Sequence, residues 1–399
     1  MPRNLPDWLI GYLEYTQSHE ATDKLHFWVG ATVISAALKR QVFMKRVRYN
    51  LYPNLYILIV AESALARKSL AMDLGMKMLR DAVPDVFYIS GSMTPEGLVK
   101  QLNREKAIVT VTDNGGKKIG IQLDSHVMIH ADELAEAFGY DRVRASKFTI
   151  LLTKIYGAQA EHTHTLSGEG QLSLRNLYPV FIAGTDPTNL KVLPEEAVGG
   201  LIGRTIFVTE NKIKRSIAWE EEEESIKADK LYRLLKEDLY NISCLSGEII
   251  PTPGARKLFK DWYEDLNKNT SPDRRLAAFR ARCHDTALKL ATILSVARSD
   301  ELALDEIRMK AAIKYIEAQL PEFTRVSDWT VTSTYAQNRA KLLEYITRHG
   351  GAGSRAQAMK LLGLSLDEIT VLEASLENEH TIKIQVAQRN VFYKLEKEE

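Results

Sequence analysis

The 399-residue sequence has few cysteines, no excess of charge of either sign and no long apolar run. Cys244 and Cys283 are its only cysteines, too few for a disulfide scaffold, which favours a reducing compartment. Lysine and arginine total 53 against 52 for aspartate and glutamate, which excludes an overall basic coat for nucleic acid but leaves local basic patches open. The sequence has no run of about 18 apolar residues that could span a membrane and no signal-peptide cleavage pattern. We therefore expect a cytoplasmic globular protein.

The pattern of apolar residues predicts an open α/β core. Residues 6–40 have helical periodicity and define an N-terminal helical segment, assigned to 1–50. Across 51–215, short continuous apolar runs alternate with helical patterns, which is typical of strands buried on both faces of a parallel sheet. The predicted strands are 55–60, 127–130, 179–183 and 205–208, and the predicted helices between them include 68–82 and 142–156.

The rest of the chain is predicted to be mainly helical. An acidic run at 220–224 indicates a solvated boundary, and helical patterns then continue through a region assigned to 216–330. Residues 335–399 form a separate pattern of three helices followed by two strands, which is the arrangement of a winged-helix domain. Within the core, the sequence Asp113-Asn114-Gly115-Gly116 predicts a hairpin between 108–112 and 118–123, and a second hairpin is expected around 167–170.

A candidate phosphate-binding loop follows the first predicted strand. Phosphate loops join a strand to a helix that opens with Lys-Ser or Lys-Thr, where the lysine reaches the β and γ phosphates and the hydroxyl holds Mg²⁺. Lys68 and Ser69 fit these roles, but Glu62 and Arg67 stand where the common pattern has glycine. A surface Lys-Ser pair at a helix start is therefore an open alternative. The candidate loop is Ser63-Ala64-Leu65-Ala66-Arg67-Lys68-Ser69.

Polar residues after the later strands occur in the order that nucleotide hydrolysis needs. Asp132 and Glu133 follow strand 127–130, where an aspartate would orient Mg²⁺ and a glutamate would polarise the attacking water, although such pairs also cap helices. Thr185 and Asp186 end strand 179–183, beside the predicted phosphate site. Arg204 precedes strand 205–208, where it could reach a nucleotide on an adjacent subunit or be a surface arginine at a strand start.

Taken together, these motifs resemble AAA+ ring ATPases, and more narrowly the helicase-like domains of phage and mobile-element replication proteins. The loop has the form S-x-x-x-R-K-S found in that group, and the segment 201–208 is similar to the arginine-finger segment of MCM-type helicases. The resemblance implies an AAA+ P-loop NTPase core with an α-helical lid, and it implies that Thr185 is the first sensor. It also implies that Arg282, with Lys289 in reserve, is the second sensor.

The resemblance implies that the protein binds ATP and Mg²⁺ and forms a homo-oligomeric ring, expected to be a hexamer, in the bacterial cytoplasm. The expected activity is an ATP-dependent DNA helicase or translocase in phage or mobile-element replication, with a primase or other replication protein as a possible partner. The alternative is an AAA+ loader or switch that remodels a protein partner. The candidate DNA-contacting residues lie on the two predicted hairpins: Lys117, Lys118, His162, His164 and Arg175.

Overall fold

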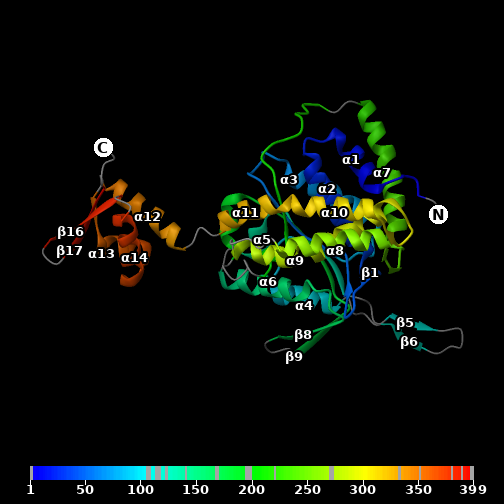
Figure 1. Ribbon diagram of the computed structural model, residues 1–399, viewed down its shortest axis with the longest axis horizontal. Helices are drawn as coiled ribbons and strands as arrows, with labels where there is room; N and C mark the ends of the chain where they lie inside the picture. The colour runs from blue at the N-terminus through cyan, green and yellow to red at the C-terminus, as the bar shows by residue number, and fades with distance from the viewer. Residues whose placement is uncertain are drawn as a thin grey trace. The chain divides into compact units, whose positions relative to one another are not determined.

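The computed structural model divides into two compact units, Met1–Trp329 and Thr330–Glu399 (Figure 1). The division of the first unit into 1–50, 51–215 and 216–330 stays a prediction. The described residues are 3–104, 109–112, 118–121, 125–139, 142–166, 170–193, 200–219, 222–268, 274–330, 334–349, 352–378, 381–387 and 390–395.

The N-terminal segment forms two helices, α1 (Trp8–Tyr15) and α2 (Asp23–Leu38). The side chain of Asp7 caps α1 by accepting a hydrogen bond from the backbone N–H of Ile10. Helix α2 is apolar almost all round and nearly all of its residues are buried, which makes it a core helix rather than an amphipathic surface helix. It packs against the central sheet and against α3 (Lys68–Ala82).

The centre of the first unit is a five-stranded parallel sheet in the order β11-β3-β10-β7-β4. The four predicted strands are confirmed, since all four continuous apolar runs form strands of this sheet. Strand β3, which is internal to the sheet, and strand β11, which lies at its edge, are both buried along their whole length, as expected where helices cover both faces. The strands are β3 (Tyr56–Val60), β4 (Tyr88–Ser90), β7 (His126–Ala131), β10 (Tyr178–Thr185) and β11 (Ile206–Thr209).

The register brings the carboxyl ends of four strands to one edge of the sheet. Thr185 of β10 and Thr209 of β11 both pair with Val60 of β3. Ala183 of β10 pairs with Ala131 of β7, so β10 lies between the strand of the candidate loop and the strand of the acidic pair. Residues that immediately follow these strands are therefore neighbours in space, although they are up to about 150 positions apart in sequence.

Helices on both faces complete the core. Helices α2 and α3 pack against each other, and α5 (Leu134–Phe138) and α6 (Arg142–Ile155) pack together beside β10. Phe138 contacts both Phe148 of α6 and Phe181 of β10 through their rings. Helix α4 (Pro95–Arg104) packs on α6. Helix α6 confirms the prediction for 142–156, and α3 has the bounds predicted for the helix after the loop.

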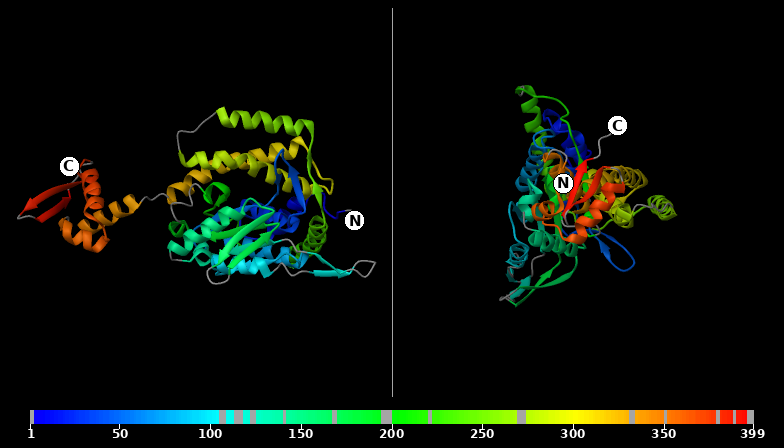
Figure 2. Two further views of the ribbon diagram at one scale, coloured as in Figure 1. Left: turned by 90° about the horizontal axis from the view of Figure 1, so that it is seen from below. Right: turned by 90° about the vertical axis from the view of Figure 1, so that its left-hand side faces the viewer.

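Two hairpins project from the same side of the first unit, at the bottom of Figure 1 and of the right view of Figure 2. One pairs β5 (Val109–Thr112) with β6 (Lys118–Ile121), and the other pairs β8 (Glu161–Leu166) with β9 (Gly170–Arg175). Both predicted hairpins are thus confirmed. A small three-stranded sheet joins β1 (Val42–Lys45) to β2 (Asn50–Leu51) and to β12 (Gly247–Glu248).

The region after the sheet is helical, as the sequence predicts. It contains α7, α8, α9, α10 and α11, whose apolar faces join the core of the first unit. Two short parallel strands, β13 (Ile250–Pro251) and β14 (Ala303–Leu304), pair with each other within this region. The helix bounds are α7 (Glu222–Ser243), α8 (Pro253–Lys268), α9 (Arg274–Arg298), α10 (Glu306–Glu317) and α11 (Gln319–Thr330).

The second unit has its own hydrophobic core of three helices and a three-stranded antiparallel sheet. Glu373 is buried in that core, where it pairs with Arg355 and accepts a hydrogen bond of 2.6 Å from Tyr393 Oη. The winged-helix assignment stays a prediction. The elements are α12 (Thr334–Arg348), β15 (Ala352–Ser354), α13 (Arg355–Leu362), α14 (Leu366–Asn378), β16 (Ile382–Ala387) and β17 (Asn390–Leu395).

Candidate functional site

The candidate phosphate loop joins β3 to α3 by a turn that adopts left-handed backbone without glycine. Ala64 has φ of 65° and Arg67 has φ of 54°. Arg67 stands at the second glycine position of the common loop pattern and takes the backbone conformation that glycine would take most easily. The loop therefore has left-handed backbone at residue 67, as it would with glycine there, although the residue is arginine.

Arg67 is held in this conformation by its side chain. Its Nε donates to Glu20 Oε2 at 2.5 Å, and its Nη1 donates to the carbonyl of Ala64 at 2.9 Å. Glu20 also accepts a hydrogen bond of 3.0 Å from the backbone N–H of Ile217. The hydrogen bonds from Arg67 and Ile217 hold the pKa of Glu20 below its usual value. Glu20 was not a predicted site residue, because it lies some 40 positions before the loop in an unremarkable connection.

Lys68 begins α3 and lies over the sheet. Its Nζ donates to the carbonyl of Ala61 at 3.3 Å, which folds the side chain back across the loop. Its stem passes Gly184 of β10, where a Cβ would lie 3.3 Å from Lys68 Cδ and 2.6 Å from the backbone oxygen of Asp132. Ser69 is exposed, and no side chain caps the start of α3. The first N–H groups of this helix therefore face the loop, as an anion-binding site needs.

The glutamate of the acidic pair is held by two polar side chains from the neighbouring strand end. Glu133 Oε1 accepts hydrogen bonds from Thr185 Oγ1 at 3.0 Å and from Asn189 Nδ2 at 3.3 Å. The structure thus brings the predicted first sensor, Thr185, into direct contact with the predicted catalytic glutamate. Asn189 was missed by sequence reasoning, although its place four residues after Thr185 in a polar segment was the available signal.

Asp186 connects the same strand end to the loop. Its Oδ2 accepts from the backbone N–H of Ser63 at 3.1 Å, and its Oδ1 accepts from the backbone and hydroxyl of Thr188. Burial pushes the pKa of Asp186 upward, but these hydrogen bonds and the charge of Lys68 outweigh it and lower the pKa overall. The carboxylate therefore stays ionised and ties the loop to β10.

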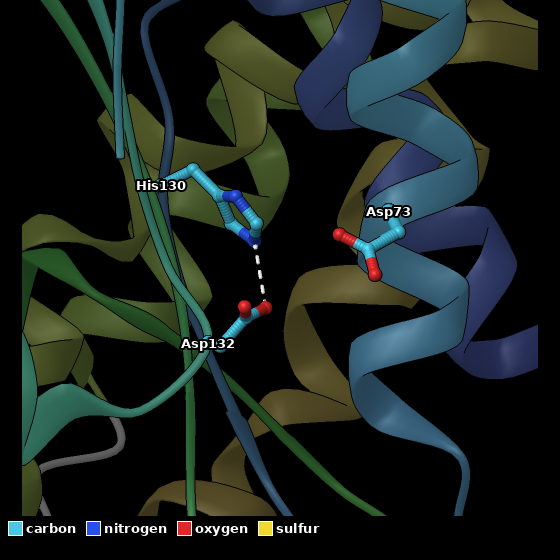
Figure 3. Close-up of side chains that lie close together, drawn as sticks. All are labelled: Asp73, His130 and Asp132. Carbon is cyan, nitrogen blue, oxygen red and sulfur yellow. Dashed lines mark ion pairs between the residues drawn. The ribbon is translucent and has the colours of Figure 1, made fainter. Parts of the chain in front are cut away.

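Asp132 lies with two residues that were not predicted, His130 and Asp73 (Figure 3). His130 is on β7 and Asp132 follows the last residue of that strand, while Asp73 projects toward them from α3, four residues after Ser69. His130 Nε2 is 3.4 Å from Asp132 Oδ1. Burial and the Asp132 charge raise the pKa of Asp73, while burial lowers the pKa of His130 against the opposing effect of both carboxylates.

Arg204 lies at the opposite edge of the sheet from the phosphate loop. It precedes β11, whose amino end is aligned with the amino end of β3, and its Nη1 donates to the carbonyl of Gly200 at 2.7 Å. Burial and the neighbouring charge of Arg282 lower the pKa of Arg204. Arg204 and Arg282 line one cavity of about 310 Å³ together with Lys289 and Asp285.

Lys289 is buried beneath that cavity. Its Nζ donates to the side-chain oxygen of Asn54 at 2.8 Å and lies 3.8 Å from the centre of the Tyr156 ring. Burial, assisted by the charge of Arg204, lowers the pKa of Lys289 to about 7. The structure therefore places Arg282 and Lys289 together with Arg204, not with Lys68.

Two cavities adjoin the phosphate loop. One of about 810 Å³ is lined by Leu70 of α3, by the segment 18–20 and by Trp219, whose side chain is almost fully exposed. Another of about 560 Å³ is lined by Ala61, by Glu62 and by three cationic side chains, those of Lys24, Lys212 and Arg325. Arg325 is on α11 and donates to Thr209 Oγ1 at 2.8 Å. Arg325 thus lines a cavity at the loop, and no sequence motif marks it.

The predicted nucleic-acid residues are placed only in part. Arg175 is exposed at the end of β9, and His162 is half-buried on β8. Lys118 and His164 lie on β6 and β8, while Lys117 lies outside the described residues. The two hairpins that carry Lys118, His162, His164 and Arg175 project from the same side of the first unit (Figure 2).

No protein-family model matches the chain, and comparison with curated proteins gave no match. Among solved structures, a full-length MCM homolog from Methanopyrus kandleri is similar over 78% of this chain, with 12% sequence identity and a TM-score of 0.43. This chain covers 58% of that structure's length. A likeness this distant carries no functional conclusion, so the site itself must support any activity. Among the helices that the structure describes, none has the length and apolar character needed to cross a bilayer.

Proposed function

We propose that the protein is an ATPase whose site is formed at the carboxyl edge of the parallel sheet. The observation that carries this proposal is the convergence of the loop lysine, Lys68, and a hydrogen-bonded glutamate, Glu133, at the ends of strands separated only by β10. A glutamate held by neutral donors stays an acceptor and can orient a water molecule. A lysine at the start of a helix whose first N–H groups are uncapped can bind a negatively charged phosphate group.

The residues present fit ATP with Mg²⁺. Lys68 and the first N–H groups of α3 would hold the phosphates, while Ser69 and Asp132 supply the oxygen ligands that Mg²⁺ prefers. When bound, Mg²⁺ would neutralise charge on the phosphates. Glu133 would accept a proton from the attacking water, and Thr185 would keep that carboxylate aligned. The 810 Å³ cavity beside Leu70 and Trp219 offers room and apolar surface for the base.

We further propose that the chain works as a ring. Arg204 and Arg282 lie together at the amino edge of the sheet, too far from the phosphate loop of their own subunit, at the carboxyl edge, to contact a nucleotide bound there. In a head-to-tail assembly this pair would face the phosphate site of the next subunit, where a guanidinium stabilises charge on the transferred phosphoryl group. A hexamer is the expected size.

DNA translocation is the function that we propose for such a ring, in replication of a phage or mobile element. The two hairpins on one side of the first unit are the structural support, since they could line a central pore. The alternative is a loader or switch that acts on a protein partner. The exposed acidic residues Asp367 and Glu377 on α14 favour this alternative for the second unit, because they would repel a DNA groove.

Mixing two inactive variants tests the site and the ring together. Lys68→Ala and Arg204→Ala should each lose ATP hydrolysis, while Arg204→Ala should still bind ATP. Mixed subunits create some interfaces with an intact Lys68 and an intact Arg204, so activity should return. Because an arginine finger contributes about 10³-fold or more to turnover, even a minority of repaired interfaces is measurable. Lys77→Ala on α3 and Arg233→Ala on α7 are matched controls that should stay active.

The outcomes separate the proposals. Normal hydrolysis by Lys68→Ala or by Glu133→Gln refutes the assigned site. If subunit exchange is confirmed with labelled protein and no activity returns, Arg204 does not act across subunits. Stimulation of the ATPase by forked DNA supports translocation, whereas an ATPase that ignores DNA supports the loader or switch.

A further inference from the structure

His130, Asp132 and Asp73 form a cluster whose ligand atoms suit a divalent cation. One ligand atom from each residue lies within 4.8 Å of the others. Two ligands on a transition-metal ion, each about 2.1 Å from it, lie about 3–4 Å apart. Both aspartates are exposed, so a small rotation of their side chains closes the remaining gap. His130 is the fixed member, since it is only 4% exposed.

The histidine is oriented as a ligand would be. Tyr88 Oη and His130 Nδ1 are 2.6 Å apart, which fixes the ring on one side. A histidine that binds metal through one nitrogen is generally held by a hydrogen bond at the other. His130 Nε2 is buried and has no hydrogen-bond partner; it faces Asp132 Oδ1 at 3.4 Å, and Asp73 lies to the side of this pair (Figure 3).

The three residues come from two segments that a cation would connect. His130 is on β7 and Asp132 follows the last residue of that strand, while Asp73 faces them from the second turn of α3. The two carboxyl groups offer oxygen ligands and the imidazole offers a nitrogen ligand, a mixed set that suits a divalent transition metal. Arg80 is the nearby opposing charge, and its Nε donates to the carbonyl of Met76 at 3.3 Å.

We propose that Asp73, His130 and Asp132 form a divalent-cation site for a metal that accepts nitrogen, such as Zn²⁺, Co²⁺ or Mn²⁺, and that this site fills without nucleotide. It differs from the Mg²⁺ position of the proposed function in two of its three ligands. An imidazole ligand favours transition metals, whereas Mg²⁺ prefers all-oxygen coordination and keeps its waters. Because Asp132 belongs to both sites, a bound ion would fix the aspartate beside Glu133.

The test uses the full chain without nucleotide, after treatment with chelator. Co²⁺ is titrated and followed by its visible absorption, and Zn²⁺ is titrated by calorimetry. We expect one ion per chain at this site, with affinity at least tenfold weaker in His130→Gln and in Asp73→Asn. His126→Gln on the same strand and Asp81→Asn on the same helix are matched controls that should bind as the parent does. Mg²⁺ should compete only weakly.

The result is independent of ATP hydrolysis. Ser69→Ala should leave Co²⁺ binding unchanged while weakening Mg²⁺-dependent ATP binding. Co²⁺ binding of equal strength in His130→Gln and in the parent protein would overturn the proposal, as would the absence of Co²⁺ and Zn²⁺ binding in the parent. The second result would leave His130 and Asp132 as a simple ion pair. Metal binding with no ATPase would refute the proposed function and leave this site standing.

Discussion

Replacing Arg67 by glycine should give a more stable protein than replacing it by alanine. At an exposed arginine within a helix, alanine should instead be the more stable replacement. Arg67 has left-handed backbone, which costs a residue with a Cβ about 1–2 kcal/mol. The greater freedom of glycine in the unfolded chain offsets about 0.4–1 kcal/mol of that difference. Arg67→Gly should therefore be more stable than Arg67→Ala by about 1 kcal/mol.

The ion pair between Arg67 and Glu20 affects the stability of both variants relative to the parent protein. Arg67 pairs with Glu20, and the Arg67 side chain is 41% exposed, so the pair contributes about 0.2–1 kcal/mol. Arg67→Ala loses the pair and keeps the strained backbone, so it should be less stable than the parent by up to about 1 kcal/mol. Arg67→Gly loses the pair but relieves the strain, and its stability should lie close to that of the parent.

Arg233 is the matched control, since it is exposed within helix α7. There Arg233→Gly should be less stable than Arg233→Ala by about 1 kcal/mol, the opposite sign. Urea unfolding followed by tryptophan fluorescence measures all four variants. The chain has five tryptophans, and every one lies in the first unit, so the signal reports that unit alone. If glycine is the less stable residue at both positions, the loop does not have left-handed backbone at 67 and the account of its glycine-poor sequence fails.

Three further changes test other parts of the first unit and its boundary. Thr185→Val removes one of the two hydrogen-bond donors to Glu133. Because a hydrogen bond to a charged group contributes about 1.5–3 kcal/mol, ATP hydrolysis should fall about tenfold or more, while ATP binding, measured separately, should be unchanged. Unchanged turnover would show that Asn189 alone aligns the glutamate. Lys289 has a pKa lowered to about 7 by burial, against about 10.4 when unfolded, so the unfolded state binds more protons between these values and stability rises with pH across that window. The unfolding free energy of the parent minus that of Lys289→Met should therefore increase from pH 7.5 to 9.5, by up to about 1.4 kcal/mol per pH unit, and a flat difference would contradict a neutral buried lysine. Deletion of residues 330–399 should leave a folded first unit with its ATPase, because the second unit has its own core; loss of the cooperative fluorescence transition would place the boundary elsewhere.

The sequence by itself determined four of the five strands of the central sheet, whereas the short edge strand β4 was not predicted. The four apolar runs that became β3, β7, β10 and β11 are continuous, since strands covered on both faces need apolar residues at every position. Helix α3 was predicted with its bounds because it begins at a Lys-Ser pair and ends before Pro84. The two hairpins were also predicted, because turn chemistry is encoded within a few residues.

The chemistry of the candidate site could be read only where it is local. Lys68, Ser69, Asp132 and Glu133 each stand next to a predicted strand, which is why the sequence singles them out. The roles assigned to them stay predictions. The left-handed backbone at Arg67 was not predicted from the sequence, because it depends on a partner, Glu20, from a distant connection.

Only the tertiary structure decided which of these side chains lie in contact, because that depends on the strand order and on the packing of segments far apart in the sequence. The insertion of β10 between β3 and β7 is what puts Thr185 against Glu133 and Asp186 against the phosphate loop. The separation of Arg282 from Lys68, and its meeting with Arg204, depends on how α9 folds back over the amino edge of the sheet. The cluster of Asp73, His130 and Asp132 likewise exists only because the fold brings α3 near the end of β7, a proximity that no local pattern encodes.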